Sequence, residues 1–392
     1  MICFDLTCCC KSPKNTGMQR TTRALFLHLR QRQHLVPIYW NVLRQRYEYA
    51  GKHELQTVEE PFRILPRALA RPDNVRENFF AELYRGVTAR PLDYHSLAAV
   101  RNTLVVPDLF RDGRLRLFPR LLKMVNLRSV AIFHDAAAIE LHELSSSATI
   151  TFQRYLTVLA LFDLVLCVSI ASQQALLKFW QENGVAPADT RVERWPVEFG
   201  ARNIEAPGAN TGILCVATLE PRKNHLTLLR AARKLWEQNI SFNLRLTGRS
   251  TRRFGRVVLP IMRRLQESGY PLTWLMHVND DRLLDEYRKC RFTVYPSLSE
   301  GFGLPVYESL WHGRPCVCGS NGALGEASKG GGCLLVEQAN PDSLADGMRQ
   351  LLVDEESYKR LVEEAARRSF RTWPAYIEQF ETCLQLAPAA SR

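Results

Sequence analysis

Two glutamates on either side of a glycine-rich turn are the first residues of this sequence that could do chemistry. The stretch "PSLSEGFGLPVYESL" places Glu300 and Glu308 eight positions apart. The apolar run before it predicts a buried strand, and Pro305 suits the first position of a helix. A glycine-rich loop that opens a helix presents N–H groups to an anion, whereas carboxylates accept hydrogen bonds from hydroxyls. The stretch therefore predicts a binding site for a ligand that contains both a phosphate and a sugar. Taken alone, it also suits a helix-dipole acid and a solvated loop acid.

Two adjacent cations make a second candidate. The stretch "LEPRKNHLTLL" follows the apolar run "GILCVAT" and places Arg222 and Lys223 just before a predicted helix. A guanidinium fork beside an ammonium point charge suits a diphosphate. A surface pair that caps the helix is the alternative.

The first half of the chain contributes two weaker candidates. His134 and Asp135 lie at the carboxyl end of the strand predicted in "AIFHDAA", and Gly17 and Arg20 lie at a strand-to-helix turn in "KNTGMQRTTR". Ligands of open α/β sheets bind outside the carboxyl ends of the strands, so we expect these residues to face a cleft. Taken alone, His134 is more typical of a structural histidine with satisfied hydrogen bonds.

The elements that position these residues alternate between strand and helix in both halves. Continuous apolar runs such as 164–169 and 213–218 are typical of parallel strands buried on both faces. We expect an α/β protein with two Rossmann-like domains facing a cleft. A Pro- and Gly-rich stretch, 184–212, predicts a last strand followed by a linker. The expected parts are an acceptor-binding domain (1–200), a nucleotide-sugar-binding domain (201–375) and a segment (376–392) that packs back on the first domain.

Composition limits the class of protein. The 392 residues are 46% hydrophobic and 23% charged, and no secretory signal is predicted. The apolar stretch 155–171 is split by Asp163, which disfavours a transmembrane helix. Eleven cysteines are scattered without metal-finger spacing, which is typical of reduced thiols in a cytoplasmic protein.

The positive charge lies almost entirely in the first third of the chain. The whole chain has a net charge of +12. Residues 1–130 contain 22 basic and 11 acidic residues, a net of +11. Within them, segment 111–128 alternates six basic residues with leucines, Phe118 and Met124. This mixture predicts peripheral contact with an anionic membrane on its cytoplasmic face. An ordinary amphipathic helix packed on its own domain is the alternative.

Taken together, these residues resemble the family-four retaining glycosyltransferases, which have two Rossmann domains in the GT-B fold. The mark of that family is a glutamate, seven residues and a second glutamate, most often as E-G-F-G-L-P-x-x-E, and residues 300–308 match it in full. The stretch "TLEPRKNH" resembles the diphosphate loop of the O-antigen mannosyltransferase branch. The resemblance is strong over 211–352 and loose over 1–200.

The resemblance implies a role for each matched residue. Arg222 and Lys223 would bind the donor diphosphate and stabilise the leaving group. Glu308 would accept hydrogen bonds from the ribose, and Glu300 from the transferred sugar. His134 would contact that sugar. The other implied donor-binding positions are Gly303, Leu304, Phe302, Gly17, Arg20, Val278 and the neighbouring His277. The first-domain loop departs from the family in having only one glycine.

The implied function is metal-independent, retaining hexosyl transfer, with no metal and no resident cofactor. The best hypothesis is mannose from GDP-mannose, moved to a lipid-linked or polysaccharide acceptor in cell-surface glycan synthesis such as that of lipopolysaccharide. A UDP-sugar-dependent transferase of the same fold is the alternative. A non-catalytic basic protein that binds nucleic acid or anionic lipid is a second alternative. No RNA-binding or helix-turn-helix pattern favours a nucleic-acid partner.

Overall fold

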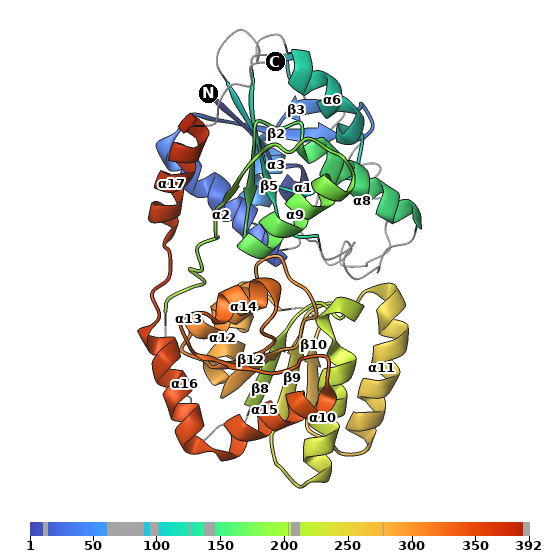
Figure 1. The fold of residues 1–392 in the computed structure, drawn as a ribbon, viewed down its shortest axis with the longest axis vertical. Coiled ribbons are helices and arrows are strands. Elements are labelled where there is room, and N and C mark those ends of the chain that lie inside the picture. The colour runs from blue at the N-terminus through green and yellow to red at the C-terminus, as the bar shows by residue number, and fades with distance from the viewer. Residues whose placement is uncertain are drawn as a thin grey trace. The chain divides into compact units, whose positions relative to one another are not determined.

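The chain forms two compact units, each built around its own sheet (Figure 1). A computed structural model describes residues 1–10, 15–60, 90–94, 102–124, 127–136, 146–202, 204, 212–276 and 278–386. The first unit comprises the described residues up to Trp195 together with those from Trp373 onward, and the second comprises Pro196–Thr372.

The first unit contains a seven-stranded sheet in the order β3-β2-β1-β4-β5-β6-β7. All neighbours pair in parallel except β3, which is antiparallel to β2 at one edge. The strands are β1 (Ile2–Asp5), β2 (Leu35–Asn41), β3 (Arg46–Tyr49), β4 (Thr103–Val106), β5 (Arg128–Phe133), β6 (Leu164–Cys167) and β7 (Asp189–Val192). The helices are α1 (Thr7–Cys10), α2 (Gly17–Arg32), α3 (Lys52–Glu59), α6 (Arg114–Met124), α8 (Ser146–Leu159), α9 (Ile170–Glu182) and α17 (Trp373–Leu386).

Helices cover both faces of this sheet. Figure 1 shows α2 and α17 on one side and α8 and α9 on the other. A capping box between Thr16 and Gln19 fixes the start of α2. The last helix, α17, returns to the first unit and packs on α2, where Trp373 stacks on His28 with ring centroids 5.2 Å apart.

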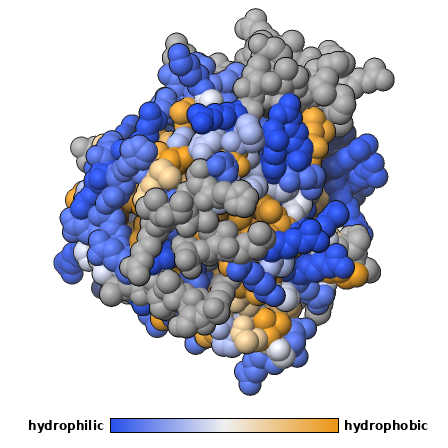
Figure 2. Space-filling model, turned by 90° about the horizontal axis from the view of Figure 1, so that it is seen from above, coloured by the Kyte–Doolittle hydropathy of each residue, from blue (hydrophilic) through white to orange (hydrophobic). Residues whose placement is uncertain are grey.

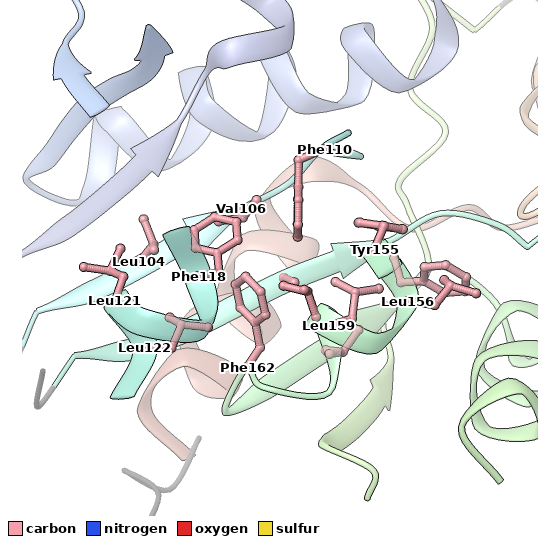
Figure 3. Packing of buried hydrophobic residues seen from close by; sticks show 14 of the residues in the cluster. Leu104, Val106, Phe110, Phe118, Leu121, Leu122, Tyr155, Leu156, Leu159 and Phe162 are labelled. Atoms are coloured by element: carbon pink, nitrogen blue, oxygen red, sulfur yellow. The ribbon is translucent and has the colours of Figure 1, made fainter. Parts of the chain in front are cut away.

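The helix α6 packs its apolar side chains into the first core. Figure 3 shows Phe118, Leu121 and Leu122 of α6 among residues of β4 and α8. Arg114, the first residue of α6, is 3% exposed and donates to Asp5 Oδ2 at 2.6 Å. Phe118, Leu121 and Leu122 therefore belong to the core, and Arg114 is in a buried ion pair, so these residues do not contribute to a lipid-facing surface over 111–128. Membrane contact through the exposed cations of this segment stays a prediction. The alternative of an amphipathic helix packed on its own domain is what the structure shows.

The side of the molecule that is uppermost in Figure 1 carries no broad apolar surface among its visible described residues. Figure 2 shows that these residues are mainly hydrophilic and that hydrophobic side chains form only small separate patches. Such isolated apolar side chains are ordinary on a protein surface. In the described part of the chain, no helix has both the length and the apolar character needed to cross a membrane.

The second unit contains a six-stranded parallel sheet in the order β10-β9-β8-β11-β12-β13. The strands are β8 (Gly212–Val216), β9 (Asn243–Thr247), β10 (Leu272–Leu275), β11 (Phe292–Tyr295), β12 (Cys316–Cys318) and β13 (Cys333–Leu335). The helices are α10 (His225–Glu237), α11 (Arg252–Glu267), α12 (Asp280–Lys289), α13 (Leu304–Trp311), α14 (Gly322–Ser328), α15 (Pro341–Val353) and α16 (Glu355–Arg367). With two parallel-sheet, Rossmann-like units, the predicted α/β fold class is confirmed.

The two faces of the second sheet have separate apolar clusters. The larger cluster joins the sheet to α10, α11 and α15 through residues such as Leu228, Val258 and Leu351. The smaller joins Leu214 of β8 to Tyr287 of α12. All eleven cysteines are free, and nine of them are buried.

Candidate functional site

The two candidate cations and the first glutamate meet at the carboxyl end of the second sheet. Arg222 and Lys223 lie in a single 3₁₀ turn, Pro221–Lys223, that follows β8, and Glu300 lies in the loop that follows β11. Because β8 and β11 are neighbours in the sheet, their loops lie side by side. The Leu298 N–H donates to the carbonyl of Arg222 at 2.8 Å and ties the two loops together.

Glu300 is the centre of this cluster. Its carboxylate accepts hydrogen bonds from Lys223 Nζ, from Tyr295 Oη at 2.8 Å and from Ser297 Oγ at 2.5 Å. Arg222 Nη1 lies 3.4 Å from its second oxygen. Burial alone would raise the pKa of Glu300, but Lys223 and Arg222 outweigh it and hold that pKa at about 2. Glu300 is therefore a buried carboxylate ionised at neutral pH.

The two cations are held by further partners. Arg222 Nε donates to Glu220 Oε1 at 2.8 Å, and its Nη1 donates to the Ser299 carbonyl at 3.2 Å. Lys223 is 8% exposed and donates to Tyr295 Oη at 2.8 Å. The cations are thus fixed in a partly buried cluster, which differs from the surface capping pair that sequence alone allowed.

Glu308 lies in α13, on the other side of the glycine-rich turn. Its side chain is nearly inaccessible, at 2% exposed, and Tyr287 Oη of α12 donates to its Oε2 at 2.9 Å. His312 stacks on the Tyr287 ring with centroids 5.5 Å apart. Burial lowers the pKa of His312 to about 4, so that the ring is neutral at pH 7. An aromatic and hydrogen-bonded support therefore holds Glu308 in place.

The turn between the two glutamates requires glycine at one position. Gly303 has φ +86°, and a Cβ there would lie 3.2 Å from a methyl group of Leu324. The next residue, Leu304, begins α13. Phe302, predicted as a donor-binding residue, stacks on Tyr307 with centroids 4.6 Å apart and is mostly buried. These contacts set the direction in which the first turn of α13 presents its N–H groups.

The predicted base-binding edge is described only in part. Val278 is half-buried against the small apolar cluster that includes Tyr287. The neighbouring His277 lies outside the described residues.

The candidates in the first unit lie just after the carboxyl end of β5 and at the start of α2. His134 Nε2 donates to the Pro107 carbonyl at 2.7 Å, and burial lowers the pKa of the ring. This imidazole is neutral and has one satisfied nitrogen. Gly17 and Arg20 lie in the first turn of α2. The cluster of cations and glutamates described above is made by second-unit residues alone.

Sequence reasoning missed three residues that support the glutamates. Tyr295 and Ser297 lie within the same stretch as Glu300, and their hydroxyls next to a strand end were a usable signal. Tyr287 is 21 positions from Glu308 on a different helix, so only the three-dimensional structure relates the two.

The same part of the chain matches a family model. The model described as "Glycosyl transferases group 1" matches residues 201–368, which lie within the second unit. The second unit is thus similar to the group 1 glycosyltransferases. The Glu300 cluster lies within the matched residues.

Two curated relatives of this chain are from Escherichia coli. The serotype-specific mannosyltransferase WbdA is 30% identical over 117 residues, 29% of this chain and 14% of that protein. The O-antigen chain mannosyltransferase B is 33% identical over 143 residues, 36% of this chain and 37% of that protein. The matches thus span well under half the length of either relative.

Solved structures match the fold over nearly the whole chain. Anabaena Alr3699/HepE in complex with UDP-glucose is 16% identical, with a TM-score of 0.70 and coverage of 98% of this chain and 99% of that one. The sucrose-phosphate synthase of Thermosynechococcus elongatus is 17% identical, with a TM-score of 0.67 and coverage of 100% and 99%. These likenesses concern the fold and cover both Rossmann-like units.

Proposed function

We propose that this chain is a metal-independent, retaining hexosyltransferase that moves mannose from GDP-mannose to a lipid-linked or polysaccharide acceptor of the cell surface. The observation that carries this proposal is the cluster of Arg222 and Lys223 around Glu300 at the carboxyl end of a Rossmann-like sheet. The names of the two Escherichia coli relatives support mannose as the sugar.

In this proposal the two cations bind the donor diphosphate. Arg222 offers a planar fork and Lys223 a point charge, and their positions are set by Glu220, Ser299 and Tyr295 before any ligand arrives. Such preorganised charge favours the leaving diphosphate as it develops negative charge. The cations therefore supply the electrostatic stabilisation that a metal ion supplies elsewhere.

Glu300 is proposed to hold hydroxyls of the transferred sugar. Its carboxylate now accepts from Lys223, Tyr295 and Ser297. When the diphosphate engages the cations, they share their hydrogen bonds between two anions, and carboxylate lone pairs become available to the sugar. Glu300 thus serves as the counter-ion of the cations in the free protein and as a sugar acceptor in the complex.

The remaining donor contacts follow from the turn. Glu308, supported by Tyr287, is proposed to accept from the ribose hydroxyls. The N–H groups of Gly303 and Leu304 at the start of α13 are proposed to contact sugar or phosphate. The bond-making step uses no protein nucleophile, since the leaving phosphate oxygen takes the proton of the acceptor hydroxyl on the same face of the sugar.

The first unit is proposed to bind the acceptor and to complete the donor site. His134 donates through Nε2 to Pro107, so its other ring nitrogen can accept from a sugar hydroxyl. Gly17 and Arg20 are proposed to contact the diphosphate. A cytoplasmic location is also proposed, in keeping with eleven cysteines that form no disulfide.

A UDP-sugar donor is the second candidate. Anabaena Alr3699/HepE, which matches the fold of this chain with a TM-score of 0.70, was solved in complex with UDP-glucose. Calorimetric titration of the protein with GDP-mannose, UDP-glucose and a CDP-linked sugar distinguishes the two. We expect tightest binding of GDP-mannose. Preference for UDP-glucose would change the donor, and no binding of any nucleotide sugar would contradict the proposed function.

A further inference from the structure

One helix of the second unit exposes an unusual run of arginines. The helix α11 carries Arg252, Arg253, Arg256, Arg263 and Arg264, all of them exposed, and a single acid, Glu267, at its last position. Figure 1 shows α11 along the outer side of the second unit, beside α10. Its opposite face packs Phe254, Val258 and Met262 into the core. The helix is therefore fixed to the domain by one face and presents a strongly basic face to its surroundings.

These five arginines make no ion pair with any residue in the described part of the chain. On the other helices of the second unit, four exposed arginines form such pairs, whereas the exposed Arg230 of α10 and Arg288 of α12 form none in the described part of the chain. The pairs are Arg233 with Glu237, Arg282 with Asp285, Arg360 with Glu364 and Arg367 with Glu363. The helix α11 thus concentrates five unpaired arginines, whereas α10 and α12 each carry one among the described residues.

The same face exposes aliphatic side chains. Val257 is 52% exposed and Ile261 is 37% exposed. The helical period stacks Arg253, Val257 and Ile261 in one row, with Arg256, Pro260 and Arg264 in the row beside it. Guanidinium groups and branched aliphatic side chains therefore project side by side from one helix face.

We propose that the exposed face of α11 binds the surface of an anionic lipid bilayer. The arginines match the negative headgroups, and Val257 and Ile261 reach the boundary between headgroups and acyl chains. The face lacks the aromatic side chains on which nucleic-acid bases stack, so a single-stranded RNA fits it less well. The attachment surface thus lies in the second unit, and not on the basic segment of the first unit.

The test is co-sedimentation of the full chain with vesicles of phosphatidylglycerol and phosphatidylcholine, or of phosphatidylcholine alone, at low and high salt. The test variant is Arg253→Glu/Arg256→Glu/Arg264→Glu. The matched control is Arg116→Glu/Arg120→Glu/Lys123→Glu, which reverses three exposed cations of α6. Both variants change the net charge equally, so a general charge effect would move them together.

We expect salt-sensitive binding to the anionic vesicles only. The α11 variant should lower the partition coefficient about 100-fold, whereas the α6 variant should leave it within about twofold of wild type. Val257→Ser/Ile261→Ser should lower it by roughly tenfold and leave the residual binding more salt-sensitive. Unchanged melting temperature and nucleoside diphosphate binding in each variant show that the domain is intact.

Equal vesicle binding by wild type and the α11 variant would overturn the proposal. So would equal losses in the α11 and α6 variants, or binding of a single-stranded RNA with no binding to anionic vesicles. Milder substitutions, Arg253→Gln/Arg256→Gln/Arg264→Gln, keep the test decisive if charge reversal impairs folding.

Discussion

At the residue scale, Glu300 has two opposing roles that a single substitution separates. Glu300→Gln removes the negative charge that Lys223 and Arg222 now contact. The released cations should bind a bare nucleoside diphosphate at least as tightly as in wild type. Transfer should nevertheless fall about 30- to 100-fold, because the sugar loses a charged hydrogen-bond partner. Calorimetry and initial rates measure the two effects, and a joint loss of binding and transfer would contradict this division.

The ion pair of Glu300 also has a consequence for stability. Its pKa in the folded chain is lowered to about 2 from an ordinary value of 4.5. A carboxylate whose pKa is lowered by folding stabilises the folded state at any pH above its pKa in the unfolded chain. This stabilisation is lost as the pH falls through its pKa in the folded chain. The melting temperature of wild type should therefore exceed that of Glu300→Gln most at pH 6 and the difference should shrink toward pH 2. A difference that does not vary over this range would exclude the lowered pKa.

Removal of the Tyr287 hydroxyl tests the role of Glu308. Tyr287→Phe keeps the ring that stacks on His312 and removes the donor to Glu308. We expect nucleoside diphosphate binding to weaken about fivefold, since a hydrogen bond typically contributes about 1 kcal/mol. Binding of the 2′,3′-dideoxy analogue should be the same in both proteins. An equal weakening for the analogue would show that the effect does not pass through the ribose.

At the element scale, the sequence predicted helices and strands with clear patterns well, and missed those whose pattern is interrupted or short. The helix expected after the turn at Gly17 and the strand expected before Glu300 are present as α2 and β11, because a capping residue and an apolar run mark them. The helix α11 was not predicted, since Gly255 and Pro260 interrupt its pattern. The short β3 was also missed, because it joins the sheet by antiparallel pairing with β2.

Gly303 tests how the turn positions α13. Gly303→Ala meets both a left-handed backbone (φ +86°) and the Leu324 methyl group at 3.2 Å. Gly269→Ala is the matched control, because Gly269 has φ +82° and no atom within 4 Å of its would-be Cβ. Both should destabilise the chain by about 1–2 kcal/mol. Only Gly303→Ala should also weaken the binding of a nucleoside diphosphate. Equal affinity in both variants would show that the turn does not contribute to the site.

At the scale of the whole molecule, the described part of the chain passes between the two units near residues 195 and 373. Trp195, Trp373 and Tyr376 pack together there, with the rings of Trp195 and Tyr376 stacked 5.2 Å apart. The sequence predicted two domains from length and from strand and helix alternation. It could not show that α6 is a core helix, because the same alternation of basic and apolar residues suits a lipid surface and a packed helix equally.

The central claim is that Arg222 and Lys223 bind the diphosphate of a nucleotide sugar. Its most direct test is calorimetric titration of Arg222→Ala and Lys223→Ala with GDP, using Arg233→Ala as the control, because Arg233 is an exposed residue paired with Glu237 on α10. Loss of a charge-assisted contact of roughly 1.5–3 kcal/mol should weaken binding at least about tenfold in each site variant. The control should match wild type, and all melting temperatures should stay close. Wild-type affinity for GDP in both site variants would contradict the claim.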